Sequence, residues 1–280
     1  MTVEENFRYT SAPERRERLV QFIGDQGYCT ISELSRAFAV SEMTIRRDVM
    51  RLVESGRVRG FRGGVGSLSR KDMLGSDYQF RDHKMGEAKR AIAARAIELV
   101  TEKSIIAIDA GTTASQVAAQ LPPDRDVKVV TNSFPVVSNL IGNGGAEVIC
   151  LGGTLHPESL SFDGPATLAA IENLQVEMLF LAASGVNERG AFCGNGFDAI
   201  TKRALIEVAE RVVLLIDSSK FASSAMVKIC DWDAIDRVIV DDGISDEQER
   251  ILEQNEVDVV KVAVPTENGQ PVAAADGVAR

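Results

Sequence analysis

The stretch SEMTIRRDVMRLVESG, residues 41–56, followed by RVRGFRGG, residues 57–64, is the most informative part of this chain. Its pattern predicts a short helix that displays paired arginines, and then a basic hairpin that ends in two glycines. In a helix-turn-helix, the second helix carries the side chains that reach base edges and phosphates in the major groove. Arginine offers paired donors to guanine or phosphate, and the short hydroxyl side chains near the helix start add further hydrogen-bonding groups. The stretch therefore predicts a DNA-binding head.

Two further helices are predicted before this stretch. Residues 14–26 carry an apolar stripe at helical spacing, and Pro13 and Gly27 bracket them in the orientation that helices prefer. A shorter helix follows, for which either Thr30 or Ser32 is the expected N-cap. Three helices and a basic wing together predict a winged helix-turn-helix.

The third predicted helix has two different faces. Ser41 is its expected N-cap, and Ile45, Val49 and Leu52 recur three and four residues apart, so they are expected to pack against the first two helices. The polar and basic side chains are left for DNA. The candidate DNA-binding residues are Ser41, Met43, Thr44, Arg46, Arg47, Arg51, Arg57, Arg59 and Arg62.

A small helical bundle with a solvated basic face is the alternative interpretation, because charge runs on helices usually mean no more than that. DNA binding is favoured because the arginines coincide with helix-turn-helix spacing and a basic wing follows them. Asp48 is expected to be structural, forming a salt bridge with Arg47 or a neighbouring arginine.

The charge is divided unequally along the chain. The 280 residues carry a formal net charge of −10, which is unusual for a protein that binds nucleic acid. Residues 1–71, however, hold 13 basic and 9 acidic side chains, a balance of +4, which leaves −14 for the rest of the chain. The acidic part is repelled by DNA, so the basic end is expected to face it.

Length and composition predict two domains joined by a linker. The expected boundaries are 1–65 for the winged helix-turn-helix, 66–86 for a polar linker packed in part through Tyr78 and Phe80, 87–264 for an α/β domain, and 265–280 for a flexible tail. The four cysteines are scattered, which argues against a zinc site or a disulfide framework. With no signal peptide and no apolar run of about 18 residues, we expect a cytoplasmic protein without a membrane segment, metal or cofactor.

From residue 87 onward, helical and strand patterns alternate. The strand segments are apolar almost throughout, as in SIIAIDAG (104–111), VKVVTNS (127–133), MLFLAAS (178–184) and RVVLLIDSS (211–219). Such strands belong to a parallel sheet covered by helices on both faces. In that architecture, ligands bind beyond the carboxyl ends of the strands.

Four loops at these strand ends carry polar groups suited to an anion: residues 109–113, 131–133, 152–154 and 217–220. Glycine lets the backbone approach the ligand, while threonine hydroxyls and the free amides of a helix start donate to it. Each loop alone is a weak signal, because a Gly-Thr-Thr turn is often only a helix cap and a strand-ending lysine usually reaches solvent. Together they predict a site for a small phosphorylated metabolite, without a Walker or dinucleotide-binding motif.

The chain resembles the DeoR family, transcriptional repressors of sugar and polyol catabolism, with features of the glycerol-3-phosphate repressor branch. The resemblance covers about residues 15–242 and rests on SEMTIRRD with RGG after it, IDAGTT, VVTNS, LGGTL, TKRALIE and DSSKF. It implies a C-terminal domain similar to the ribose-5-phosphate isomerase and CoA-transferase fold, kept as an effector sensor. The effector-binding residues that it implies, with two neighbours from the same loops, are Asp109, Gly111, Thr112, Thr113, Asn132, Ser133, Gly152, Gly153, Asp198, Lys202 and Lys220.

One segment departs from the family pattern. Many members carry a glutamate-alanine pair just before the Lys-Arg of the TKRA-type segment, whereas this chain has GFDAITKR at residues 196–203. Asp198 takes the place of that glutamate with a shorter reach. We therefore expect loop 193–198 to set the identity of the effector.

Four other side chains have competing interpretations. His83 lies in the predicted linker and is expected to be solvated. His156 either lies in a surface loop, which is favoured, or contacts a sugar hydroxyl or phosphate. Trp232 is expected at a core edge or a subunit interface, and Cys193 is expected to pack rather than to act as a nucleophile, because no histidine lies near it in the sequence.

Two functions follow from these observations. The favoured one is a repressor, acting as a dimer or tetramer on double-stranded operator DNA, that a phosphorylated sugar or polyol releases. The alternative is a sugar-phosphate isomerase with an added DNA-binding head. An isomerase needs a carboxylate base in the pocket, for which Asp109, Asp198 and Asp217 are candidates.

Overall fold

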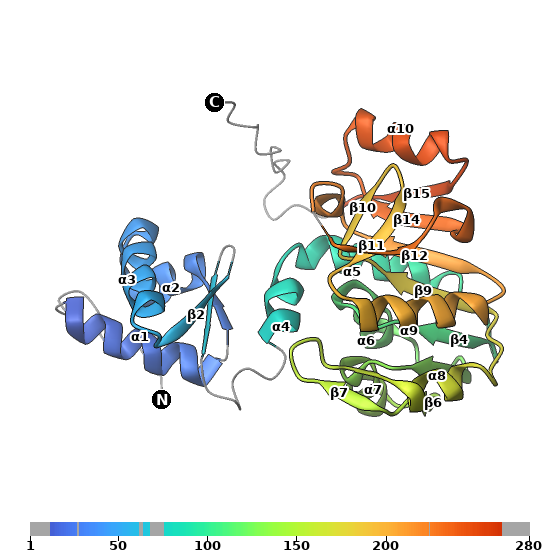
Figure 1. Ribbon diagram of the computed structural model, residues 1–280, viewed down its shortest axis with the longest axis horizontal. Coiled ribbons are helices and arrows are strands. Elements are labelled where there is room, and N and C mark those ends of the chain that lie inside the picture. The colour runs from blue at the N-terminus through green and yellow to red at the C-terminus, as the bar shows by residue number, and fades with distance from the viewer. Residues whose placement is uncertain (1–11, 27, 62–63, 68–75, 224, 265–280) are drawn as a thin grey trace. The chain divides into compact units, whose positions relative to one another are not determined.

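The computed structural model describes residues 12–26, 28–61, 64–67, 76–223 and 225–264 (Figure 1). The predicted tail 265–280 and the candidate residue Arg62 lie outside these ranges. The chain divides into two compact units: residues 1–84 together with 157–159, and residues 85–156 together with 160–280.

The N-terminal unit contains the three predicted helices: α1 Ala12–Gln26, α2 Ile31–Phe38 and α3 Glu42–Glu54. Thr30 is the N-cap of α2: its hydroxyl accepts a hydrogen bond from the amide of Glu33, whose carboxylate in turn accepts one from the amide of Thr30 at 2.7 Å. Ser41 is the N-cap of α3, as predicted: its hydroxyl accepts a hydrogen bond from the amide of Thr44. The buried apolar side chains that join the helices include Leu19, Ile23, Leu34, Phe38, Ile45, Val49 and Leu52.

A three-stranded antiparallel sheet completes this unit. Its strands are β1 Tyr28–Thr30, β2 Val58–Phe61 and β3 Gly64–Ser67, in the order β1-β3-β2. The hairpin β2–β3 confirms the predicted wing, whereas β1, only three residues long, was not predicted. A side chain at Gly64 would overlap the Tyr28 hydroxyl, so the close pairing of β1 and β3 requires glycine here.

The segment predicted to be a linker differs from expectation. Strand β3 continues to Ser67, past the predicted boundary at residue 65, and the predicted linker contains helix α4 Ser76–His83. The sequence of α4, SDYQFRDH, lacks a continuous apolar stripe. Hydrophobic periodicity therefore gave no signal for this helix.

The larger unit is built on a seven-stranded parallel sheet, as predicted. The strand order is β15-β14-β12-β9-β4-β5-β6. The strands are β4 Ile105–Ile108, β5 Val127–Thr131, β6 Ala146–Cys150, β9 Met178–Ala182, β12 Val212–Ile216, β14 Arg237–Asp241 and β15 Asp258–Val262.

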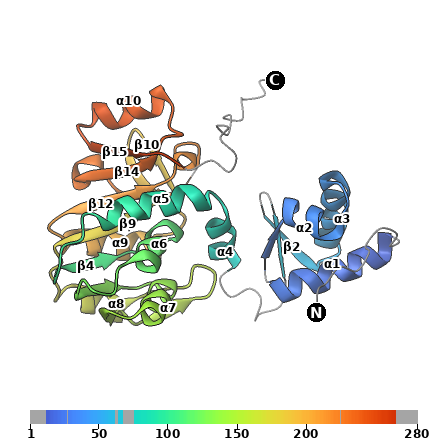
Figure 2. The same ribbon diagram turned by 180° about the vertical axis from the view of Figure 1, so that it is seen from behind.

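Helices cover both faces of this sheet. Alternate strand residues point to opposite faces, so Ala107 joins one apolar core while Ile106 and Ile108 join the other. Figure 1 shows α9 in front of the sheet, and Figure 2, the view from behind, shows α5 and α6 in front. One face carries α5 Gly86–Ile97, α6 Thr112–Gln120 and α7 Phe134–Asn143, and the other α8 Pro165–Ile171, α9 Gly196–Glu207 and α10 Asp246–Gln254.

Smaller elements were not predicted. They are the hairpin β7 Thr154–His156 with β8 Ser161–Asp163, the antiparallel sheet of β10 Gly185–Asn187, β11 Gly190–Cys193 and β13 Val227–Cys230, and the 3₁₀ turns η1 Ser218–Lys220 and η2 Trp232–Ala234. Strands of three or four residues are too short for alternation to identify. Among the described residues, no helix has both the length and the apolar character needed to cross a bilayer.

Candidate functional site

Helix α3 presents the predicted basic face to solvent. Arg46, Arg47 and Arg51 are exposed, as is Met43 at 76%. Met50, 57% exposed, lies three and four residues from Arg47 and Arg46 and so shares this face. It is missing from the sequence-based candidates, although its spacing from the arginines could have identified it.

The hydroxyl groups at the start of α3 are engaged with each other. The Ser41 Oγ accepts a hydrogen bond from the Thr44 amide at 3.3 Å and lies 3.0 Å from the Thr44 Oγ1. Next to them, Arg46 forms an exposed ion pair with Glu42, at 3.4 Å. The first turn is therefore ordered by its own side chains before any DNA contact.

Asp48 is structural and forms a salt bridge with arginine, as predicted, although not with Arg47. Its carboxylate accepts a hydrogen bond from Arg15 at 2.7 Å and lies 3.6 Å from an Nη of Arg16, both on α1. Asp48 is buried because it lies on the side of α3 that faces α1, and Arg47 lies on the exposed side. Of the two predicted alternatives, Arg47 or a neighbouring arginine, the structure excludes Arg47, and the salt bridges of Asp48 join the candidate recognition helix to α1.

The arginines of the wing differ in what they contact. Arg57 donates two hydrogen bonds to Glu17, at 2.5 and 2.7 Å, and these lower the pKa of Glu17 and raise that of Arg57. The guanidinium of Arg59 lies over the ring of Phe61, 5.3 Å from its centre. Arg57 is thus engaged within the head, which makes it a weaker candidate for direct DNA contact than Arg46 or Arg47.

In the larger unit, all four predicted loops follow the carboxyl ends of parallel strands. The loop after β4 leads into α6 through Gly111, the N-cap. A side chain at this position would overlap the Cβ of Ala182, at the end of neighbouring β9. Because glycine provides no capping side chain, the first amides of α6 are left for another acceptor.

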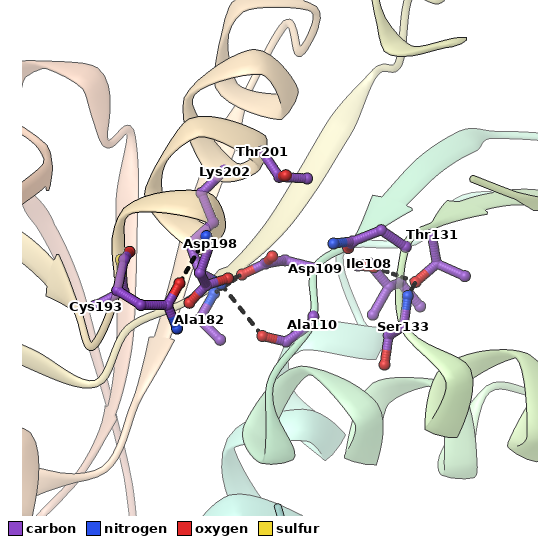
Figure 3. Close-up of polar contacts among 12 residues, drawn as sticks. Ile108, Asp109, Ala110, Thr131, Ser133, Ala182, Cys193, Asp198, Thr201 and Lys202 are labelled. Carbon is purple, nitrogen blue, oxygen red and sulfur yellow. Dashed lines mark hydrogen bonds and ion pairs between the residues drawn. The ribbon is translucent and has the colours of Figure 1, made fainter. Parts of the chain in front are cut away.

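A buried ionic cluster lies beside this turn. Figure 3 shows Lys202 extending from α9 toward Asp109 and Ala110 at the end of β4. Its ammonium forms an ion pair with Asp109, lies 3.4 Å from Asp198 and donates to the Ala110 carbonyl at 3.2 Å. The Ala182 amide donates to the same Asp109 oxygen at 2.9 Å. The structure therefore joins three of the predicted effector-binding residues in one cluster.

Burial and neighbouring charges shift the pKa values of Lys202 and Asp109 in this cluster. Burial lowers the pKa of Lys202, but Asp109 and Asp198 outweigh this and raise it above the ordinary 10.5. The pKa of Asp109 is raised above its ordinary value, because burial and the nearby Asp198 outweigh the ammonium of Lys202, which favours the carboxylate.

The loop after β5 is ordered by its own polar side chains. Thr131 donates to the Ile108 carbonyl at 2.6 Å, and the Ser133 Oγ accepts from the Val136 amide at 3.4 Å, which caps α7. Asn132 donates through Nδ2 to the Phe162 carbonyl of β8, at 3.0 Å. The hydroxyl of Ser133 is thus engaged as a helix cap.

Three acceptor atoms in the four loops are buried and have no hydrogen-bond partner among the described residues; one of them, Oδ2 of Asp217, lies 3.6 Å from the ammonium of Lys220. Asp109 Oδ1 and Asn132 Oδ1 have no hydrogen-bond partner among the residues that the structure describes. Buried polar atoms in folded proteins nearly always have partners, so both atoms remain available as acceptors for a group that the described residues do not supply.

The remaining two loops lie on either side of this centre. After β6, the Gly152 carbonyl accepts a hydrogen bond from Thr167 at 2.5 Å, and Gly153 has a φ of +141°, which favours glycine. After β12, Lys220 lies 3.6 Å from buried Asp217. Since β9 separates β12 from β4, Lys220 follows a strand that is not adjacent to that of Asp109.

The side chains with competing interpretations now have defined surroundings. His156 lies 2.6 Å from Asp163 and stacks on Phe197 of α9, with the ring centres 3.7 Å apart. Burial raises the pKa of the Cys193 thiol to about 11, which supports packing rather than nucleophilic attack. Trp232 is buried and donates to the Asn187 carbonyl at 3.0 Å, so it belongs to the core. The side chain of His83 lies outside the described part of the chain.

Two family models match the chain. Residues 15–71 match the DeoR-like helix-turn-helix domain, and residues 84–242 match the DeoR C-terminal sensor domain. A putative aga operon transcriptional repressor from Escherichia coli O157:H7 is 33% identical, covering 91% of this chain and 96% of its own length. An L-fucose operon activator from Haemophilus influenzae is also 33% identical, and the match covers 87% of this chain and 97% of the activator. The glycerol-3-phosphate regulon repressor of Escherichia coli K12 is 31% identical, with 81% and 90% covered.

Among solved structures, ribose 5-phosphate isomerase A of Methanocaldococcus jannaschii is similar to part of the chain. It is 19% identical, the match covers 49% of this chain and 55% of the isomerase, and the TM-score is 0.37.

Proposed function

This chain belongs to the DeoR family of helix-turn-helix transcription regulators, and from that premise we propose that it represses an operon for the catabolism of a sugar or polyol. A phosphorylated form of that sugar or polyol binds the larger unit and releases the protein from its operator. The names of the relatives support the choice of operon, since they refer to the aga operon, the L-fucose operon and the glycerol-3-phosphate regulon. One relative is an activator, so repression is the part of the proposal that needs its own test.

The exposed basic face of α3 supports the DNA-binding part. Arg46, Arg47 and Arg51 lie on it, while Asp48 fixes the opposite side of the helix to α1. Because the helix is already fixed to α1, its exposed arginines can contact base edges and phosphates without a rearrangement of the other side chains of the head. Because operators of such heads contain repeated half-sites, we propose that the working form is a dimer or tetramer.

The observation that carries the effector part is the start of α6. The close packing of Gly111 on Ala182 leaves the first amides of the helix without a capping side chain. Such a helix start attracts a phosphate through its free amides and the helix dipole. The hydroxyls of Thr112 and Thr113 on this first turn add donors for the same anion.

A thermal-shift panel tests this assignment. Phosphorylated pentoses, hexoses and polyols, each paired with its unphosphorylated parent, are added to the full-length protein. A phosphorylated compound at 100 times its Kd stabilises a folded domain by about 2.7 kcal/mol, which is readily measured. If no phosphorylated compound stabilises the protein, or if each unphosphorylated parent stabilises it equally, the phosphate group is not recognised and this part of the proposal is wrong.

We propose regulation rather than isomerisation because of how the candidate bases are engaged. Asp109 and Asp198 share the ammonium of Lys202, and Asp217 is buried beside Lys220. A general base must be able to take a proton from substrate carbon, and each of these carboxylates already lies beside a lysine ammonium of the protein itself. Incubation of the protein with pentose and hexose phosphates, followed by product analysis, is expected to show no interconversion; turnover at enzymatic rates would favour the isomerase.

A further inference from the structure

We propose that Met43 determines part of the operator sequence. Its thioether side chain contacts the 5-methyl group of a thymine in the major groove, between two arginines that contact the phosphate backbones on either side. The inference rests on the DNA-binding part of the proposed function and goes beyond it, because it assigns one base to one side chain. Effector binding plays no part in it.

The first observation is where the exposed apolar side chains of the head lie. Among the side chains of residues 12–84 that the structure describes, the large apolar ones exposed to solvent are Met43, Met50 and Val53, and all three belong to α3. Val53 is close to the wing, since a Cβ atom at Gly60 of β2 would lie 3.2 Å from one of its methyl carbons. Met43 is 76% exposed, so it contributes little to the core of the head.

The second observation is the position of Met43 around the helix. An α-helix turns by about 100° per residue, so Met43 and the exposed Arg47 lie within about 40° of each other. Both are on the side opposite to Ile45 and Leu52, which are buried in the core of the head. Met43 therefore lies on the centre line of the exposed face, the line that points directly away from that core.

Arginines flank this centre line on both sides. Arg46 lies about 60° from Met43 in one direction, and Arg51 lies about 80° from it in the other. The positive charges on both flanks make duplex DNA, a polyanion, the partner that the apolar side chain between them meets. A helix in the major groove turns its centre line to the base edges and its flanks to the two phosphate backbones. Arg46 and Arg51 are thus placed for phosphates, and Met43 for a base.

The two ends of α3 differ in their acidic residues. Glu42 in the first turn is paired with Arg46 at 3.4 Å, whereas Glu54 in the last turn is exposed and forms no ion pair with any described residue. Met50 precedes Glu54 by four residues, so it lies beside a carboxylate that DNA phosphates repel. In a helix-turn-helix, the N-terminal residues of the recognition helix contact the base edges. Met43 is therefore better placed to read a base than Met50.

The chemistry of the side chain selects the base. A thioether has no donor and is only a weak acceptor, so it cannot form the hydrogen bonds that the polar edges of guanine, adenine and cytosine require. Thymine presents an apolar methyl group in the major groove, and apolar side chains are its usual partners. Methionine is unbranched and polarisable, so it adapts its shape to such a contact. Burial of one methyl group against Met43 is expected to raise DNA affinity about fourfold.

Replacement of thymine by uracil tests this contact, because it removes the methyl group and keeps every hydrogen-bonding group of the base pair. The full-length protein first selects its preferred duplexes from a randomised pool. Each thymine of one half-site is then replaced in turn by uracil, and the affinity is measured by fluorescence anisotropy. We expect at least one position at which uracil weakens binding of the wild-type protein about fourfold.

Two variants identify Met43 as the residue that contacts this methyl group. Met43→Gln keeps a similar length but is polar, and it is expected to bind the thymine and uracil duplexes equally at that position. Met43→Leu stays apolar and is expected to keep a difference of about twofold or more. The matched control is Met226→Ala, which truncates an 80% exposed methionine of the larger unit and should distinguish the two duplexes as the wild type does. Both positions are exposed, so all three variants are expected to fold.

The outcomes separate this inference from the proposed function. If the protein binds its selected duplexes but uracil changes the affinity at no position, the inference is overturned and the DNA-binding function stands. The same holds if Met43→Gln still distinguishes thymine from uracil as the wild type does. If no duplex is enriched from the pool, the proposed function fails together with the inference. If the methyl contact is found but no phosphorylated compound alters DNA affinity, the inference stands and the effector part of the proposed function does not.

Discussion

Gly111 and Ala182 pack so closely that a Cβ atom on the first would overlap the Cβ of the second. The two residues belong to neighbouring elements, since Gly111 follows β4 and Ala182 ends β9, the strand paired with it. Ala182 also donates its amide to Asp109 at 2.9 Å. This single contact therefore sets both the start of α6 and the position of the buried carboxylate.

Gly111→Ala tests that contact. Overpacking is expected to destabilise the larger unit by about 1–3 kcal/mol and to abolish the response to the effector. Gly142→Ala is the matched control, because a side chain there meets nothing within 4 Å and the residue lies within α7, so its stability should be unchanged or slightly higher. Urea unfolding and effector titration measure both effects; wild-type behaviour of Gly111→Ala would contradict the packing account.

Removing the ammonium of Lys202 alone should lower the free energy of unfolding more than removing the charges of Lys202 and Asp109 together. Lys202→Met leaves Asp109 without its counter-charge and is expected to destabilise by about 3–5 kcal/mol. In the double variant with Asp109→Asn the uncompensated charge disappears, so part of that loss should return. Chemical unfolding of both single variants and the double variant measures this coupling. Additive effects would show that the two residues do not depend on each other.

The exposed arginines of α3 should determine operator affinity. Arg46→Ala and Arg47→Ala are each expected to weaken operator binding by about 1–3 kcal/mol while effector binding persists. Arg90→Ala, an exposed arginine of α5 that forms an ion pair with Glu87, is the control and should bind DNA normally. Fluorescence anisotropy with a labelled duplex measures all three. Normal binding by either α3 variant would remove that residue from the interface.

The N-cap of α2 gives a prediction on stability alone. Thr30→Ala removes the two hydrogen bonds that the Thr30 hydroxyl forms with Glu33, one accepted from its amide and one donated to its carboxylate, and is expected to destabilise the head by about 1 kcal/mol. Ser32→Ala, at the other position that the sequence allowed, should change stability by less than about 0.5 kcal/mol, because Ser32 is exposed. A greater loss from Ser32→Ala in thermal unfolding would reverse the assignment.

The sequence predicted the main helices and strands because their signals are local. Strands such as β9 and β12 are five-residue apolar runs, and α3 has its apolar positions three and four apart. Strand β1 and the hairpin β7–β8 are only three residues per strand, so they carry no such signal. Helix α4 lacks an apolar stripe and was expected to be linker.

The site was predicted less completely, because its contacts join distant parts of the chain. Parallel strands bring their carboxyl ends to one edge, so the loops after β4 and β5 could be placed together without a structure. The partner of Asp48 lies 33 residues away and that of Asp109 lies 93 residues away, and no local pattern identifies either. The resemblance to the DeoR family selected Asp109 and Lys202 separately, but not their ion pair.

The most direct test measures DNA affinity with and without effector. Full-length protein is titrated by anisotropy against duplexes from upstream of its own and neighbouring genes, at two salt concentrations, with and without a mixture of sugar and polyol phosphates. We predict binding that weakens steeply with salt, as phosphate contacts require, and a further loss of affinity when the mixture is present. A DNA affinity that does not depend on the salt concentration, or one that no phosphorylated compound alters, would contradict the account.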